Sequence, residues 1–193
     1  MTLKDRIIRL IETGGPIPVS TYMQLALHDS AQGYYATRPG LGTDFITAPE
    51  VSQVFGELIG LWVVNEWRAM GAPDSFHLVE IGPGRGTLMA DALRLAYVAG
   101  GREFADAAKL TLVEPSPELR KVQAERLSDY TPSFADTLGN VPAGPMILVA
   151  NEYLDCLPAR QFRKADGQWR ECVVGLDADG ALAFGLAADE QRA

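Results

Sequence analysis

Cysteine is scarce in this sequence, and that scarcity excludes a disulfide-stapled domain. The 193 residues contain two cysteines, Cys156 and Cys172, which do not form a CxxC pair. We therefore expect reduced thiols and a cytosol-like compartment rather than a secreted scaffold. Histidine is equally rare, and neither His28 nor His77 stands at a spacing typical of metal ligands, so we predict no metal site.

Long hydrophobic runs and long runs of one charge are also missing. No apolar stretch approaches the roughly 20 residues that cross a bilayer, so we expect no membrane insertion. Seventeen lysines and arginines stand against 25 acidic residues, a net charge of −8, which argues against nonspecific nucleic-acid binding. What is present, with 47% hydrophobic residues, suffices for the core of one folded domain.

Residues 1–72 predict helices and one long loop. Thr2, with Asp5 three residues later, is a capping pattern for an N-terminal helix. Residues 30–50, SAQGYYATRPGLGTDFITAPE, are rich in glycine and aromatic residues and lack clear periodicity, which is typical of a lid or binding loop. Residues 51–70 are apolar on most faces and predict a mostly buried helix.

Short apolar runs then alternate with helical or turn-rich segments, a pattern that predicts a parallel α/β sheet with helices on its faces. The runs are residues 76–82, 109–116, 132–136 and 145–152. Residues 162–186 predict a C-terminal β-hairpin or meander with Asp179 and Gly180 at a tight turn. No linker stands out. We therefore predict one structural domain, in which residues 1–72 form a helical segment with a lid loop that packs on a core of residues 73–193.

The first apolar run ends in a glycine-rich turn, LVEIGPGRGTLMADALRLA. Gly82, Gly84 and Gly86 stand where a strand turns into a helix, the place where open α/β sheets bind ligands. Glycine there lets a ligand approach the backbone and the helix N-terminus. The spacing is not the G-x-G-x-x-G of dinucleotide folds, and Glu80 would repel a pyrophosphate but attract a sulfonium or ammonium group. A tight strand-helix crossover without a ligand is the alternative.

Acidic residues also end the next two runs. Glu114 ends the second run, at the position where a carboxylate accepts hydrogen bonds from ribose hydroxyls. Asp136 ends the third run and could receive an adenine amino group, although aspartate after a short strand also suits a turn or helix cap. Glu80, the glycine turn, Glu114 and Asp136 together resemble the cofactor site of class I S-adenosylmethionine-dependent methyltransferases.

Longer strings make the resemblance narrower. GYYATRPGLGTDFITAPEVSQVFGELIGLW, LVEPSPELRKVQ and ANEYLDCLPARQF resemble the MidA family of methyltransferases, which includes a mitochondrial complex I assembly factor that methylates an arginine. The resemblance implies a Rossmann-like sheet, S-adenosylmethionine as cofactor, and an arginine of a protein substrate, a respiratory complex I subunit. It also implies a cytoplasmic location in a bacterium, or the mitochondrial matrix in a eukaryote. Oligomeric state is left open.

The resemblance further implies a sheet larger than this chain supplies. The family has seven strands, whereas the apolar runs provide about four before the hairpin. We therefore expect an incomplete sheet, whose fourth strand needs another partner or leaves an open edge. A partial or truncated chain would account for this.

Candidate catalytic residues follow the fourth run. Methyl transfer is an in-line displacement that depends mainly on positioning, and Asn151 and Glu152 are expected at the carboxyl end of that strand, beside the cofactor. Glu152 and Asp155 could both face a guanidinium, whose planar fork favours carboxylates. The alternative is a strand end with ordinary turn hydrogen bonds and a solvated Glu152.

The loop before residue 51 adds three candidates for lid or substrate contacts, Asp44, Thr47 and Glu50. Thr47 and Glu50 also suit the start of a helix, and we expect both roles together. For the whole chain, the alternative to an enzyme is a non-catalytic S-adenosylmethionine-binding assembly chaperone. A nicotinamide enzyme is opposed by the glycine spacing and by Glu80.

Overall fold

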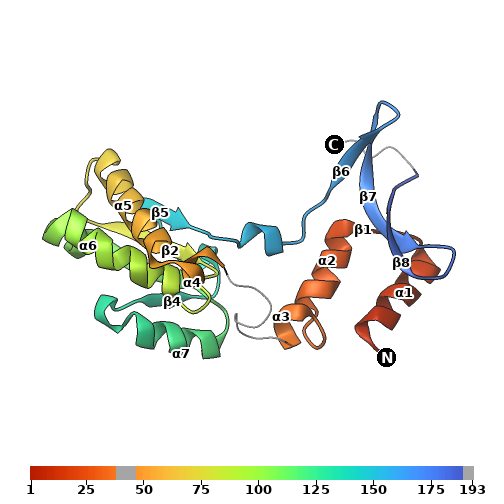
Figure 1. Cartoon of the computed structure of the whole chain (residues 1–193), viewed down its shortest axis with the longest axis horizontal. Coiled ribbons are helices and arrows are strands. Elements are labelled where there is room, and N and C mark those ends of the chain that lie inside the picture. The colour runs from red at the N-terminus through yellow and green to blue at the C-terminus, as the bar shows by residue number, and fades with distance from the viewer. Residues whose placement is uncertain (38–46, 189–193) are drawn as a thin grey trace. The chain divides into compact units, whose positions relative to one another are not determined.

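The computed structural model of the chain describes residues 1–37 and 47–188 (Figure 1). They fall into two compact units: the first unit joins Met1–Pro39 to Asp155–Ala193, and the second unit spans Gly40–Leu154. The sequence predicts one domain with a boundary at residue 72, which differs from the boundaries of these two units. That prediction is not tested by them and stays a prediction.

A parallel sheet forms the centre of the second unit, with its strands in the order β4-β3-β2-β5. The strands are β2 (Phe76–Ile81), β3 (Ala108–Val113), β4 (Ser133–Ala135) and β5 (Met146–Val149). Three of them lie within the apolar runs and β3 begins one residue before its run, so the predicted parallel sheet is confirmed. Leu78 is in register with Leu110 and Ile147, and all four carboxyl ends therefore meet at one edge.

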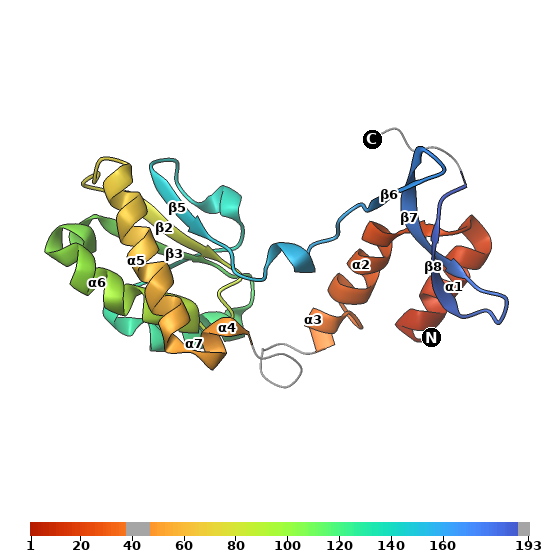
Figure 2. The ribbon, with the colours of Figure 1, turned by 45° about the horizontal axis from the view of Figure 1, so that its top comes forward.

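The helices of the second unit alternate with these strands. They are α4 (Ala48–Val51), α5 (Gln53–Ala69), α6 (Thr87–Ala107) and α7 (Pro117–Arg126), with short 3-10 turns η1 (Ser128–Tyr130) and η2 (Leu138–Asn140). Figure 2 shows α5 and α6 side by side, consistent with their dense contacts. The Ser116 side chain caps α7 by accepting a hydrogen bond from Leu119 N at 3.4 Å, because the first amides of a helix have no partner within it.

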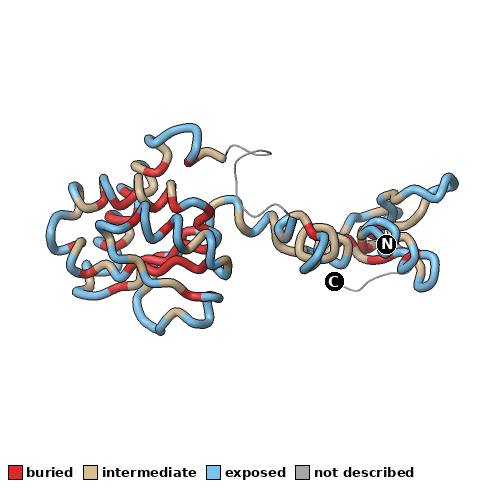
Figure 3. The backbone as a smooth tube through the Cα atoms, turned by 90° about the horizontal axis from the view of Figure 1, so that it is seen from below, coloured by how far each residue is buried: buried red, intermediate tan, exposed pale blue. Residues whose placement is uncertain are grey.

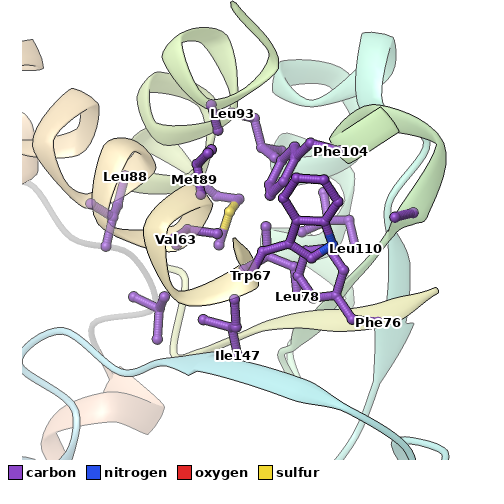
Figure 4. Packing of buried hydrophobic residues seen from close by; sticks show 14 of the residues in the cluster. Val63, Trp67, Phe76, Leu78, Leu88, Met89, Leu93, Phe104, Leu110 and Ile147 are labelled. Atoms are coloured by element: carbon purple, nitrogen blue, oxygen red, sulfur yellow. The ribbon is translucent and has the colours of Figure 1, made fainter. Parts of the chain in front are cut away.

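Aromatic residues build the core between these helices and the sheet (Figure 4). The Trp67 and Phe104 rings meet edge to face with centroids 5.4 Å apart, and Phe76 lies 5.6 Å from Phe104. All three are buried, and Figure 3 shows the buried stretches concentrated in the strands of this unit. Truncation of such a side chain costs about 3–5 kcal/mol, so this cluster is a main source of the unit's stability.

The prediction that residues 51–70 are mostly buried is wrong for one face of α5. A Cβ added to Gly60 would lie 2.1 Å from the Ala92 carbonyl oxygen, so this glycine lets α5 approach α6 closely. On the other face Val54, Leu58 and Trp62 are exposed by 56%, 60% and 44%. Apolar composition alone does not say which faces of a helix find neighbours.

The first unit combines helices from the start of the chain with an antiparallel sheet from its end. The helices are α1 (Leu3–Gly14), α2 (Val19–His28) and α3 (Tyr34–Thr37), with η3 (Leu154–Cys156) at the unit boundary. The strands are β1 (Ile17–Pro18), β6 (Phe162–Ala165), β7 (Gln168–Leu176) and β8 (Leu182–Leu186). β7 pairs with the other three strands, so the predicted C-terminal hairpin is confirmed and gains β1.

Two details of the first unit follow from its sequence. Thr2 and Asp5 form the predicted capping box at the start of α1, which satisfies two otherwise unpaired amides. Ile7 and Ile11 on one face of α1 pack with Val174 of β7 in a small apolar core. The amphipathic start of the chain is thus a helix that covers the antiparallel sheet.

Candidate functional site

The three predicted glycines lie in the turn between β2 and α6. Gly82, Gly84 and Gly86 have φ values of 65°, 54° and 76°, all in the left-handed region that favours glycine. α6 begins at Thr87, directly after Gly86. The turn therefore brings bare backbone next to a helix N-terminus, where free amides and a partial positive charge suit a polar ligand.

Tyr153 packs on this turn, a contact that sequence reasoning missed. A Cβ on Gly82 would lie 2.6 Å from Cδ2 of Tyr153, so the lack of a side chain at residue 82 admits the ring. Tyr153 follows β5, the strand next to β2 in the sheet. Its only signal in the sequence is its place in ANEYLD, directly after the residues expected at the end of the fourth strand.

Glu80 is a buried carboxyl near the end of β2, with 2% of its surface exposed. Its Oε2 atom has no hydrogen-bond partner among the described residues. Burial raises the pKa of Glu80 to about 8, because removal from water disfavours the charged form. A cation beside this carboxylate would favour ionisation, so the position suits a positively charged ligand.

Glu114 directly follows β3 and is 6% exposed. Its amide donates to the Ala135 carbonyl at 3.0 Å, and its Oε1 atom accepts a hydrogen bond from Ser116 N at 2.8 Å. Burial raises the pKa of Glu114, whereas hydrogen bonds from Ser116 and Gln123 and the charge of Arg120 oppose that rise. Since β2 and β3 pair along their length, Glu114 and the glycine turn lie at the same edge of the sheet.

Asp136 follows β4 and has a partner that the sequence did not predict. Arg120 Nη2 forms an ion pair with Asp136 Oδ1 at 2.7 Å, and the Asp136 side chain is 74% exposed. The same guanidinium donates from Nε to the Glu114 carbonyl oxygen at 2.6 Å. Arg120 thus links the ends of β3 and β4, and a role of Asp136 toward adenine stays a prediction.

The three candidate catalytic residues fall on both sides of the unit boundary. Asn151 and Glu152 follow β5 in the second unit, where Glu152 is exposed and has a left-handed φ of 49°. Asp155 belongs to the first unit and is exposed. Asp155 lies close enough to Tyr35 to affect its pKa, which is raised by burial, by a hydrogen bond with Cys156 and by neighbouring charges including Asp155. A shared role of these carboxylates toward one guanidinium stays a prediction.

Of the three lid candidates, Thr47 and Glu50 are described and Asp44 lies outside the described residues. Thr47 precedes α4 as its N-cap residue, although its side chain makes no capping hydrogen bond. Glu50 Oε1 accepts a hydrogen bond from Thr87 Oγ1 at 2.7 Å, and Arg126 donates to the same hydroxyl at 2.7 Å. Glu50 therefore lies both at a helix start and beside the first residue of α6.

Other candidate chemistry has little support in the described part of the chain. Within residues 1–37 and 47–188, no group of three or more His, Cys, Asp or Glu side chains is arranged to hold a metal ion. No helix in those ranges is long and apolar enough to cross a membrane. Cys156 and Cys172, which both fall in the same ranges, form no disulfide. His28 stacks on the Tyr35 ring, and its Nε2 lies 3.0 Å from the Cys156 carbonyl oxygen.

Sequence comparison gives a consistent set of relatives. Residues 58–193 match the Methyltransf_28 model, which describes S-adenosyl-L-methionine-dependent methyltransferases. The chain is 40% identical, over an alignment of length 206, to the protein arginine methyltransferase NDUFAF7 homolog, mitochondrial, of Drosophila melanogaster, covering 93% of this chain and 46% of the relative. It is 38% identical to protein arginine methyltransferase NDUFAF7, mitochondrial, of Danio rerio, covering 94% and 49%. The chain thus spans about half the length of these relatives.

Solved structures agree with this result. A protein from Burkholderia thailandensis crystallised with S-adenosyl-homocysteine superposes with a TM-score of 0.75 at 29% identity, covering 98% of this chain and 50% of that one. A native structure of a protein from the same organism gives a TM-score of 0.71 at 30% identity, covering 96% and 47%. The predicted Rossmann-like methyltransferase fold is confirmed.

Proposed function

Because the chain belongs to the Methyltransf_28 family of S-adenosyl-L-methionine-dependent methyltransferases, we propose that its second unit binds S-adenosylmethionine. We also propose that the whole protein transfers the methyl group to an arginine of a protein substrate. Support for the arginine comes from the relatives named protein arginine methyltransferases. A respiratory complex I subunit is the substrate that the resemblance to the MidA family implies.

The buried Glu80 carboxyl beside the glycine turn is the observation that carries this proposal. Its Oε2 atom lacks a partner among the described residues, and a buried carboxylate without one is unfavourable. A ligand with positive charge next to this oxygen would remove that penalty. S-adenosylmethionine carries a sulfonium and an ammonium group, so the residues present fit this cofactor better than a diphosphate, which Glu80 would repel.

When bound, S-adenosylmethionine supplies an electrophilic methyl group on a positively charged sulfur. In the proposed site Glu80 favours that positive charge, and the Glu114 carboxylate offers acceptor oxygens to ribose hydroxyls. Gly82, Gly84 and Gly86 keep the backbone of the turn open to the ligand. Asp136 is assigned to the adenine amino group, for which it would have to share its carboxylate with Arg120.

For the substrate we assign Asn151, Glu152 and Asp155. The left-handed φ of 49° at Glu152 supports this, because strained backbone at a non-glycine residue is often retained at functional sites. An arginine guanidinium holds its proton tightly, so carboxylates both orient it and stabilise charge. Glu152 would accept the proton that the guanidinium nitrogen releases as that nitrogen takes the methyl group, whose bond to sulfur breaks so that S-adenosyl-homocysteine leaves.

Asp44, Thr47 and Glu50 are assigned to the lid or substrate contacts, and the Glu50 hydrogen bond to Thr87, next to the glycine turn, supports one of them. Relatives carry the word mitochondrial in their names. A cytoplasmic location of this chain stays a prediction.

The test combines cofactor binding with methyl transfer. This chain is titrated with S-adenosyl-homocysteine, and the whole protein is incubated with methyl-labelled S-adenosylmethionine and cell lysate. We expect binding, labelling of a specific protein on arginine, and loss of labelling in Glu152→Gln with binding unchanged. Glu125→Gln, an exposed change on α7, is the control that should label as the wild type does.

Each failure has a separate meaning. Binding without labelling by the wild type would favour the non-catalytic assembly chaperone over the enzyme. Absence of binding to S-adenosyl-homocysteine would refute the cofactor assignment itself. Equal labelling by the wild type and Glu152→Gln would refute only the role given to Glu152.

A further inference from the structure

A buried glutamine lies between the two strand ends that form the proposed cofactor site. Gln123 is fully buried, at 0% exposure, and is the one buried residue of α7, a helix rich in charged side chains. An amide in such a position is unfavourable unless its hydrogen bonds are satisfied. Burial of this amide is therefore expected only where a hydrogen-bond partner stabilises it.

The neighbours of the Gln123 amide are in the glycine turn and at the residue that follows β3. Its Nε2 atom donates to the Gly84 carbonyl oxygen at 2.6 Å. The same side chain also lowers the pKa of Glu114, so the amide faces that carboxylate in addition to its direct contact with the glycine turn. Its Cγ atom would lie 3.5 Å from a Cβ added to Gly86, and the stem of the side chain therefore packs along the turn.

We propose that Gln123 is a positioning residue of the cofactor site, whose amide holds the Gly84 carbonyl and the Glu114 carboxylate in one fixed arrangement. This rests on the proposed function, in which Glu114 meets the ribose. The two protons of one amide nitrogen can serve both acceptors. Each acceptor then keeps its other lone pairs, and the glycine turn cannot move away from α7 without breaking a buried hydrogen bond.

Packing alone does not account for a glutamine here. A leucine of similar size would fill the same space without burying an amide, and Oε1 of Gln123 has no partner among the described residues. The fold therefore accepts an unsatisfied acceptor in order to keep the donor. Ionised Glu114 benefits from that donor, together with Ser116 N and the Arg120 guanidinium that also face it.

Two variants separate positioning from packing. Gln123→Leu keeps the volume and removes the donor, and Gln123→Glu keeps the shape while placing a second carboxylate beside Glu114. Glu125→Leu, on the exposed face of the same helix, is the matched control. The affinity for S-adenosyl-homocysteine is measured by calorimetry from pH 5 to pH 9, and thermal unfolding is recorded for each protein.

Loss of a hydrogen bond to a charged group predicts roughly 10- to 100-fold weaker binding for Gln123→Leu. Without the donor, the pKa of Glu114 rises. As the pH is lowered, both variants should therefore lose binding at a higher pH than the wild type does, and the difference should be larger for Gln123→Glu. The Glu80 carboxyl also titrates but is common to all proteins, so the difference from the wild type reports on Glu114. Glu125→Leu should match the wild type.

The inference is overturned if either folded variant binds S-adenosyl-homocysteine as tightly as the wild type with the same pH dependence. It is also overturned if Gln123→Glu loses thermal stability while its binding curve keeps the wild-type pH dependence, since Gln123 would then serve packing only. Failure of the wild type to bind refutes the proposed function first and removes the premise of the inference.

Discussion

Replacement of Glu80 by glutamine should make the protein more stable at neutral and alkaline pH. The side chain is 2% exposed on β2, and Oε2 has no partner among the described residues. The new amide would have the same shape as the protonated carboxyl but no acidic proton to lose. The variant Glu80→Gln therefore removes the titration of a buried acid with little change in packing.

The size of the effect follows from the two states of the carboxyl. The unfolded chain releases this proton near pH 4.5, whereas burial in the folded protein raises the pKa to about 8. The stability that depends on a neutral Glu80 is thus fully present below pH 4.5 and is lost progressively as the pH rises toward 8. At about 1.4 kcal/mol per pH unit, the wild type loses about 3 kcal/mol by pH 7 and about 4 kcal/mol by pH 8, and the loss levels off at about 5 kcal/mol above that pH, whereas Glu80→Gln loses none of it.

Urea unfolding from pH 5 to pH 9, followed by tryptophan fluorescence, measures this difference. The matched control is Glu103→Gln, the same chemical change at an exposed position of α6. We expect the gap between Glu80→Gln and the wild type to widen with pH and then level off. Parallel curves for the two proteins over the whole range would refute the account of a buried, neutral Glu80.

Three further changes test other parts of the fold. Gly82→Ala should destabilise the second unit by about 1–3 kcal/mol, because its φ is 65° and the new Cβ would lie 2.6 Å from the Tyr153 ring; an unchanged urea midpoint would contradict the close approach. Phe104→Ala should lower the free energy of unfolding by about 3–5 kcal/mol in the same assay. A decrease of less than about 1 kcal/mol would mean that the aromatic core is not tightly packed. In the first unit, Arg160 Nε and Nη2 donate to the Glu171 carboxylate at 2.7 and 3.0 Å and hold the pKa of this buried group below its usual value. The stability that the pair adds is therefore present above pH 4.5 and is lost on acidification. Glu171→Gln should lower the melting temperature at pH 7 and make it less dependent on pH below 4.5, and an unchanged dependence there would show that the pair is not its cause.

The fold of the second unit could be predicted because its signals are local. Short apolar runs favour buried strands, and β2, β3, β4 and β5 form at the four runs. The glycines of the G-x-G-x-G turn are needed because the backbone there is left-handed. The capping box of Thr2 and Asp5 is equally local. Glu80 and Glu114 followed from the rule that parallel strands end at one edge of a sheet.

The contacts that were missed depend on residues distant in sequence. Gln123 reads as one more polar residue of a surface helix, and only the packing of α7 against the glycine turn buries it. Tyr153 is recognised as part of the site only once β5 lies next to β2. The Arg120 pair with Asp136 joins two strand ends, and no spacing rule indicates it. The grouping of α1 and α2 with the C-terminal strands is likewise a long-range property.

The central claim is that the edge formed by the ends of β2 and β3 receives a sulfonium nucleoside and its thioether product. A crystal structure of this chain grown with S-adenosyl-homocysteine tests it most directly. The account predicts ligand density against the glycine turn, with the ribose hydroxyls on the Glu114 carboxylate. Density elsewhere in the molecule, or a site closed by protein side chains at saturating ligand, would contradict it.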